Sequence, residues 1–368
     1  MDVGGEAEMD LTGRLGTAFG VLDRLVAGPV RGAALAVAVG GEVVAERYAG
    51  EAAPAVAAGP TTLWPLASIS KLYTAAVAMA LVERGEITLA MRVASVLPSY
   101  VGGGREETTL RHLLTHTGGL IYESPRMAEL LAAQTPLDAI VDEAFAGDLL
   151  FAPGTSQLYS DLGYALSGRV LATATGRSLP ELVRTLVLEP GGLAETFMPP
   201  PPEVDGRIAS VDGVFAEGTD GAMYNSTYAR ELAHPAFGAV ASLRDLLAFG
   251  LLLAPSGPRR LLSRAGTAAM TTDQTGSDLP GEVVRPPVGV IHPWGIGCMI
   301  KGRSVYPELA SAGSYGHGGA SGCHLWVDPA EDVVVALVSN RHLNADPDEF
   351  FARIDRVHST VMAGLTSG

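Results

Sequence analysis

Lysine is almost absent from this chain, since only Lys71 and Lys301 occur among its 368 residues. Arginine supplies nearly all the other positive charge, and no basic run offsets a net charge of -15. Nucleic acids and anionic membrane surfaces both repel a protein this acidic. We therefore expect neither a nucleic-acid partner nor a membrane partner.

Cysteine is equally scarce. The two cysteines, Cys298 and Cys323, form neither a CxxC pair nor a zinc-type spacing with histidine. This pattern excludes a disulfide framework. We expect both residues to be free, buried thiols, in keeping with a reducing compartment. The sequence predicts no metal and no cofactor.

Long apolar runs are missing as well. The longest, residues 74–82 and 246–254, fall well short of the roughly 20 residues that cross a bilayer. The opening MDVGGEAEMD is acidic and polar, unlike a secretory signal. These features predict a cytoplasmic protein. Its apolar content of 47% is ample for one large core or two joined domains.

Both ends of the chain have strand patterns. Two strand-like runs in residues 33–48 are joined by Gly40 and Gly41, which favour a tight hairpin turn. A second hairpin is predicted for residues 323–340, and helical spacing of apolar residues follows over residues 348–365.

Most patterns between these ends are helical. We therefore predict an α/β (α+β) protein, in which an antiparallel sheet is flanked by helices and interrupted by a mostly helical insertion. Residues 12–98 and 286–366 would form the sheet domain, and residues 99–285 the inserted domain. A cleft is expected where the two meet.

The main chemical signal is a serine followed three residues later by a lysine. Ser68 precedes an alanine-rich helical stretch, so Lys71 would lie one turn along on the same face. A serine near a helix start is a candidate nucleophile, because exposed N–H groups there stabilise an oxyanion. A buried, neutral lysine could take its proton.

A helix-capping serine and a solvated lysine would produce the same spacing. Against that interpretation, a chain with two lysines carries one inside an apolar helix. On its own the S-x-x-K spacing is moderate evidence.

Three further motifs follow in chain order. Residues 111–120 read RHLLTHTGGL, residues 151–164 read FAPGTSQLYSDLGY, and residues 315–319 read YGHGG. With these motifs the chain resembles the class C β-lactamase family of penicillin-recognising serine hydrolases, which also holds esterases, D-aminopeptidases and acyltransferases. The resemblance extends over about residues 30–345.

The resemblance implies roles for several residues. Ser68 would form an acyl-enzyme, while Lys71 and Tyr159 share the proton transfers. Tyr159 would then activate the water or acceptor that releases the product. The backbone N–H groups of Ser68 and Ala320 would form the oxyanion hole.

The same resemblance implies a substrate-binding wall. Gly318 and Gly319 belong to the YGHGG motif, and Tyr122 and Glu123 match a loop that lines the cleft in relatives. His317 stands where β-lactamases carry the lysine of K-T-G. The missing lysine would supply a cation that holds a substrate carboxylate, so we expect β-lactamase activity to be weak or absent.

Asp161 is a second departure, because the family has asparagine there. One alternative is that its carboxylate lies beside Lys71, favours the protonated amine and leaves more of the base role to Tyr159. The other alternative is that Asp161 caps the following helix and points away from the cleft.

Other candidates carry less chemistry. His112 and His116 have the spacing of a helical zinc pair, but HExxH is not matched and we interpret both as scaffold. The GGASGC stretch contains no G-x-S-x-G nucleophile elbow. Trp294 and Trp326 are expected in the core or the cleft wall.

The predicted function is a serine hydrolase acting on a small ester or amide through acyl-Ser68. One alternative is a transacylase that passes the acyl group to an amine or alcohol. From another class, a non-catalytic binding module on the same fold is a third possibility.

Overall fold

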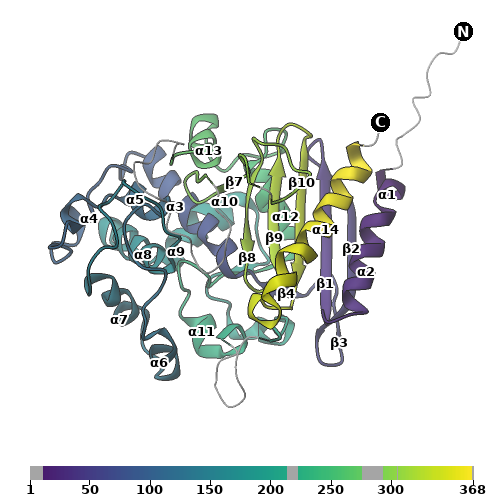
Figure 1. The fold of residues 1–368 in the computed structure, drawn as a ribbon, viewed down its shortest axis with the longest axis horizontal. Coiled ribbons are helices and arrows are strands. Elements are labelled where there is room, and N and C mark those ends of the chain that lie inside the picture. The colour runs from purple at the N-terminus through teal and green to yellow at the C-terminus, as the bar shows by residue number, and fades with distance from the viewer. Residues whose placement is uncertain (1–10, 214–222, 276–292, 305, 367–368) are drawn as a thin grey trace, which may run out of the picture.

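A computed structural model describes residues 11–213, 223–275, 293–304 and 306–366. Its largest element is an antiparallel sheet of seven strands in the order β3-β2-β1-β10-β9-β8-β7 (Figure 1). The strands span Gly32–Val39 (β1), Glu42–Ala53 (β2), Val56–Ala57 (β3), Met299–Ile300 (β7), Tyr315–Gly319 (β8), Cys323–Asp328 (β9) and Val333–Ser339 (β10).

The two ends of the chain meet at the centre of this sheet. β1 pairs with β10 from Ala33 opposite Ser339 to Val39 opposite Val333. Both predicted hairpins are confirmed, since β1 pairs with β2 and β9 with β10. Gly40 and Gly41 turn the first hairpin with positive φ angles of 60° and 85°, which glycine adopts readily.

Helices cover both faces of the sheet. α2 (Gly16–Val26) and α14 (Pro347–Thr366) pack together on one face, which confirms the predicted C-terminal helix (Figure 1). α12 (Leu243–Leu253) contacts β1, β9 and β10. Mixed α/β architecture with an antiparallel sheet is therefore confirmed.

α3 (Ser70–Glu83) is the central helix of the molecule. Every residue from Ser70 to Leu81 is buried. Its apolar residues are spread around the whole helix, a pattern typical of a helix surrounded by protein. Gly85, with a φ of 70°, follows the end of the helix.

The remaining elements lie between β2 and β7 along the chain, apart from one N-terminal turn. A small sheet has the order β4-β6-β5. The bounds are Leu11–Arg14 (α1), Val93–Val96 (α4), Leu110–Leu114 (α5), Met127–Ala132 (α6), Leu137–Asp142 (α7), Asp161–Thr175 (α8), Leu179–Val183 (α9), Glu189–Gly191 (α10), Thr227–Glu231 (α11), Arg264–Thr271 (α13), Leu63–Pro65 (β4), Thr196–Phe197 (β5) and Val240–Ser242 (β6).

The predicted division into domains stays a prediction. Its boundary at residues 285 and 286 lies outside the described residues. α12 belongs to the predicted helical insertion along the chain, yet it packs on the large sheet. Cys298 and Cys323 are both free and buried, as predicted. Within the described ranges, no helix is long and apolar enough to cross a membrane.

Candidate active site

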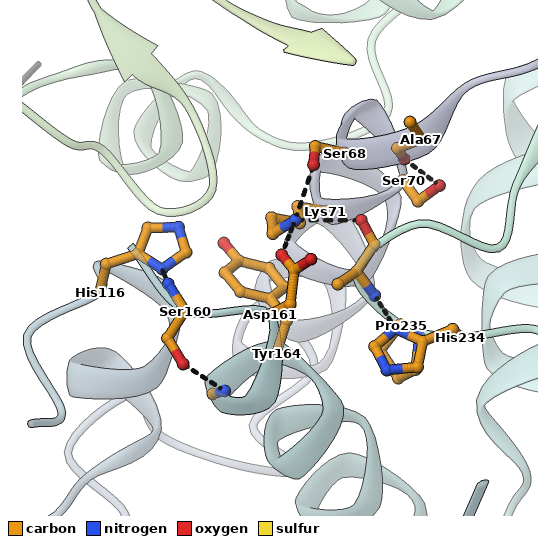
Figure 2. A network of polar contacts seen from close by, with 12 residues as sticks. Ala67, Ser68, Ser70, Lys71, His116, Ser160, Asp161, Tyr164, His234 and Pro235 are labelled. Atoms are coloured by element: carbon orange, nitrogen blue, oxygen red, sulfur yellow. Dashed lines mark hydrogen bonds and ion pairs between the residues drawn. The ribbon is translucent and has the colours of Figure 1, made fainter. Parts of the chain in front are cut away.

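Ser68 lies in a tight turn that joins β4 to α3. The turn is the 3-10 helix Ala67–Ile69, and Ser68 is partly exposed while its neighbours are buried. Ala67 has a φ of 46°, an unfavourable value for alanine that the surrounding structure must hold in place. Ser70 holds it, because its Oγ donates to the Ala67 carbonyl at 2.7 Å (Figure 2). The same Oγ accepts from the Ala239 N–H at 2.9 Å.

The Lys71 side chain is fully buried and its Nζ has three partners. Nζ lies 3.1 Å from Ser68 Oγ, 3.1 Å from the Ala236 carbonyl oxygen and 2.6 Å from Asp161 Oδ1 (Figure 2). The carbonyl and the carboxylate only accept hydrogen bonds, whereas the serine hydroxyl can donate or accept. Three contacts therefore satisfy either an ammonium or a neutral amine. The two states differ only in the direction of the bond between Lys71 and Ser68.

Burial lowers the pKa of Lys71 below its usual value, and the Asp161 carboxylate opposes that shift without cancelling it. Burial disfavours the charged form of a lysine, while a neighbouring negative charge favours it. The net direction makes Lys71 easier to deprotonate than a lysine in water.

The orientation of Asp161 decides between the two alternatives left open by the sequence. Its carboxylate forms an ion pair with Lys71. The helix cap is Ser160, whose Oγ accepts from the Gly163 N–H at 2.8 Å. The capping alternative for Asp161 is therefore wrong, because the preceding serine already caps α8 and leaves the carboxylate directed at the lysine.

Tyr159 lies beside the same pair. The Nζ of Lys71 is 4.7 Å from the centre of its ring. Removal from water and the charge of Asp161 raise the pKa of Tyr159 well above its usual value, although a hydrogen bond with Ser68 lowers it in part. The phenol is therefore held in its protonated form and can donate a proton or relay one.

His317 and Ala320 come from the end of β8 next to the nucleophile turn. The buried His317 ring is 6.1 Å from the Tyr159 ring and 5.5 Å from the Trp294 ring. Its Nδ1 lies 2.6 Å from the Gly318 carbonyl oxygen, so this nitrogen carries the hydrogen. A Cβ at Gly319 would lie 2.2 Å from the Leu66 carbonyl oxygen. Only glycine, which has no Cβ, lets β8 approach the backbone before Ser68 this closely.

Tyr122 and Glu123 border the Asp161 side of the site. The Tyr122 carbonyl accepts from the Asp161 N–H at 2.8 Å, and its ring lies 6.1 Å from the Tyr159 ring. The charge of Asp161 and burial raise the pKa of Tyr122. Burial and the charge of Asp161 also raise the pKa of Glu123 to about 7. The structure thus brings these two predicted residues next to the catalytic candidates.

Sequence reasoning missed one contact and undervalued another. The Ala236 carbonyl, which accepts from Lys71, is a backbone atom with no sequence signature. His116, interpreted as scaffold, packs its ring 4.3 Å from the Tyr159 ring. The HTGGL motif that contains His116 was the available signal. Among the described residues, no group of three or more His, Cys, Asp or Glu side chains could hold a metal ion.

Comparison with known proteins assigns this arrangement to a family. A family model described as Beta-lactamase matches residues 20–358. The chain belongs to the beta-lactamase family. The resemblance drawn from the motifs around Ser68 and Tyr159 is confirmed.

Known members of the beta-lactamase family show how varied it is. This member is 29% identical over 333 residues to penicillin-binding protein 4 from Amycolatopsis lactamdurans, covering 84% of this chain and 81% of that protein. It is 32% identical to esterase EstB from Burkholderia gladioli, over 36% of this chain and 38% of the esterase. The solved structure of a penicillin-binding protein homologue from Caulobacter crescentus matches with a TM-score of 0.74 at 25% identity, covering 95% of this chain and 97% of that one.

Proposed function

We propose that this beta-lactamase family member is a serine hydrolase that cleaves a small ester or amide through an acyl-Ser68 intermediate. The observation that carries the proposal is the 3.1 Å contact between Ser68 Oγ and the buried Nζ of Lys71. A nucleophilic serine needs a base within hydrogen-bond reach, and burial gives Lys71 the lowered pKa of such a base.

Acylation begins with proton transfer along this contact. Ser68 Oγ attacks the substrate carbonyl carbon as its proton moves to the neutral Lys71 Nζ. The N–H groups of Ser68 and Ala320 stabilise the negative oxygen. When the bond to the leaving group breaks, Tyr159 donates its phenol proton to that group and regains one from the Lys71 ammonium.

Deacylation repeats the sequence with water. Water attacks the acyl carbon and gives up a proton through Tyr159 to Lys71, and Ser68 leaves with that proton as the acid is released. Tyr159 serves as a relay rather than as a resting phenolate, because its pKa is raised well above its usual value by removal from water and by Asp161. This assigns the base role to Lys71.

The test is ester turnover by a variant without the nucleophile. Wild type is expected to release nitrophenol from nitrophenyl acetate and to show an acyl adduct on Ser68 by intact mass. Ser68→Ala should lower kcat by at least about 10³-fold. Ser95→Ala, which removes an exposed serine of α4, should keep the wild-type rate.

Two outcomes would contradict the proposal. Full activity in Ser68→Ala would remove Ser68 as nucleophile. Conversion of the acyl group only to an amide or new ester, when amines or alcohols are added, would make the chain a transacylase.

Substrates without a free carboxylate fit the site better than β-lactams. His317 stands in place of a lysine whose ammonium could hold a carboxylate, and such a charge-assisted hydrogen bond contributes about 1.5–3 kcal/mol. We expect nitrocefin hydrolysis by wild type to be slow, and His317→Lys to raise the acylation rate by at least about 10-fold. Stopped-flow absorbance measures both. Rapid nitrocefin turnover by wild type would contradict this prediction.

A further inference from the structure

His116 occupies a buried position at the centre of the site. It follows α5, has a φ of 61° and is 2% exposed. Histidine tolerates this left-handed conformation better than most residues. Figure 2 shows its ring beside Ser160, at the start of α8.

One residue holds the backbone on both sides of Tyr159. The Leu158 N–H donates to the His116 carbonyl at 2.9 Å, and the Ser160 N–H donates to His116 Nδ1 at 3.0 Å. The His116 ring itself lies 4.3 Å from the Tyr159 ring, tilted by 31°. The tyrosine is thus fixed by two hydrogen bonds to its neighbours and by contact along its ring.

These contacts require one form of the imidazole. Nδ1 accepts a hydrogen bond, so the hydrogen must be on Nε2. Burial and the charge of Lys71 hold the pKa of His116 well below its usual range, which keeps the ring neutral. Nε2 is buried and has no hydrogen-bond partner among the described residues. The ring is therefore fixed in one orientation by its neighbours, and in the part of the chain that the structure describes it has no acceptor for the Nε2 hydrogen.

We propose that His116 is a positioning residue that fixes the Tyr159 phenol relative to Ser68 and thereby sets kcat rather than substrate affinity. The proposal rests on the proposed serine hydrolase function. It differs from a general scaffold role because its effect must pass through Tyr159.

His112 is the matched control. It lies four residues earlier, and its Nδ1 also accepts from a backbone N–H, that of Thr109 at 3.2 Å. This bond caps α5, where the Thr109 side chain accepts from the His112 N–H in return. Replacing His112 removes the same kind of bond without touching Tyr159.

Two substitutions of His116 distinguish the contribution of its imidazole ring from that of its Nδ1 hydrogen-bond acceptor. In His116→Asn the side-chain oxygen can occupy the place of Nδ1, and asparagine tolerates the positive φ. In His116→Gln the amide is displaced by one carbon. We expect His116→Gln to lower kcat by about 10- to 100-fold with KM little changed, because small misplacements of catalytic groups are costly. His116→Asn should recover most of the lost rate.

Coupling to Tyr159 is measured with a double-mutant cycle. Tyr159→Phe should abolish the effect of His116→Gln, so the double variant should be no slower than Tyr159→Phe alone. His112→Gln should lower Tm by a similar amount to His116→Gln while leaving kcat near wild type. Additive effects of His116→Gln and Tyr159→Phe, or equal rates for His116→Asn and His116→Gln, would overturn the proposal.

A fluorophosphonate probe separates this proposal from the proposed function. Its rate of attachment to Ser68 is measured for each variant by intact mass, which needs no known substrate. If wild type labels no faster than Ser68→Ala, the serine hydrolase function fails and the role of His116 fails with it. If wild type labels normally while the cycle is additive, only the role of His116 is overturned.

Discussion

At the scale of single residues, the Asp161 carboxylate opposes the deprotonation of Lys71. Its carboxylate is 2.6 Å from Nζ, and both side chains are almost fully buried. Burial alone would lower the pKa of Lys71 further than it does in the presence of Asp161. The ion pair therefore holds the amine in place but keeps a larger fraction of it protonated at low pH, so less of it is free to accept a proton.

Asp161→Asn is expected to shift the pH dependence of the proposed hydrolase activity toward lower pH. Removing the carboxylate lowers the pKa of Lys71, so a larger fraction of the amine is neutral at any given pH. The acid limb of kcat/KM against pH should shift down by about 1–3 units, the size of a close ion-pair effect. A rate profile from pH 4 to pH 10 measures it.

The control for this shift is Asp23→Asn. Asp23 forms an exposed ion pair with Arg47 at 2.8 Å, so its removal changes the net charge equally without altering the site. A shift of the acid limb toward higher pH in Asp161→Asn would contradict the assignment of Lys71 as base.

At the scale of elements, α8 connects the Tyr159 side of the site with the segment whose Ala236 carbonyl accepts a hydrogen bond from Lys71. Asp161 is the first residue of α8 and Tyr159 lies two residues before it, and the Asp161 carboxylate forms an ion pair with Lys71. Further along, a Cβ at Gly168 would lie 2.5 Å from Cγ of Pro235. Pro235 precedes Ala236, whose carbonyl accepts from Lys71. The packing of one helix thus fixes two partners of the lysine.

Gly168→Ala should therefore destabilise the fold and slow catalysis together. The added methyl meets a rigid proline ring, and overpacking a core site costs about 1–3 kcal/mol. We expect a lower Tm by calorimetry and a lower kcat, because the displaced segment carries the Ala236 carbonyl.

Gly20→Ala is the matched control for that substitution. Gly20 lies in α2, where an added Cβ would meet only the end of the Arg24 side chain at 3.5 Å. Alanine favours a helix over glycine by about 1 kcal/mol, so this variant should be more stable than wild type. An equal gain in stability for Gly168→Ala would contradict the close packing of α8.

At the scale of the whole molecule, the net charge of -15 gives the protein a negative electrostatic field. A field of one sign raises the local concentration of oppositely charged ligands and is screened by salt. Lys71 does not offset this field at the site, since Asp161 pairs with it.

Ionic strength should therefore change the preference among charged substrates. At low salt, kcat/KM for a cationic ester should exceed that for a size-matched anionic ester by on the order of 10-fold. Near 1 M salt, where the Debye length is about 3 Å, this ratio of kcat/KM values should fall to the ratio set by the reactivity of the two esters alone. A ratio independent of salt would contradict long-range steering. A neutral ester serves as the control.

Much of this fold and site could be predicted from local sequence. The Gly40–Gly41 turn, the hairpin of residues 323–340 and the terminal helix need only turn chemistry and periodicity. The spacing of Ser68 and Lys71 likewise determines that they share a helix face. Together with the motifs at residues 111–120, 151–164 and 315–319, this spacing was sufficient to identify the family.

Tertiary structure alone decided how the segments meet. The direction of Asp161, the contact of the Ala236 carbonyl with Lys71 and the hydrogen bond between His116 and Ser160 join positions 90, 165 and 44 residues apart. No local preference governs such contacts, because they depend on how buried elements pack around α3. The sequence by itself determined which residues could react, and packing determined which of them hold Lys71 and Tyr159 in place.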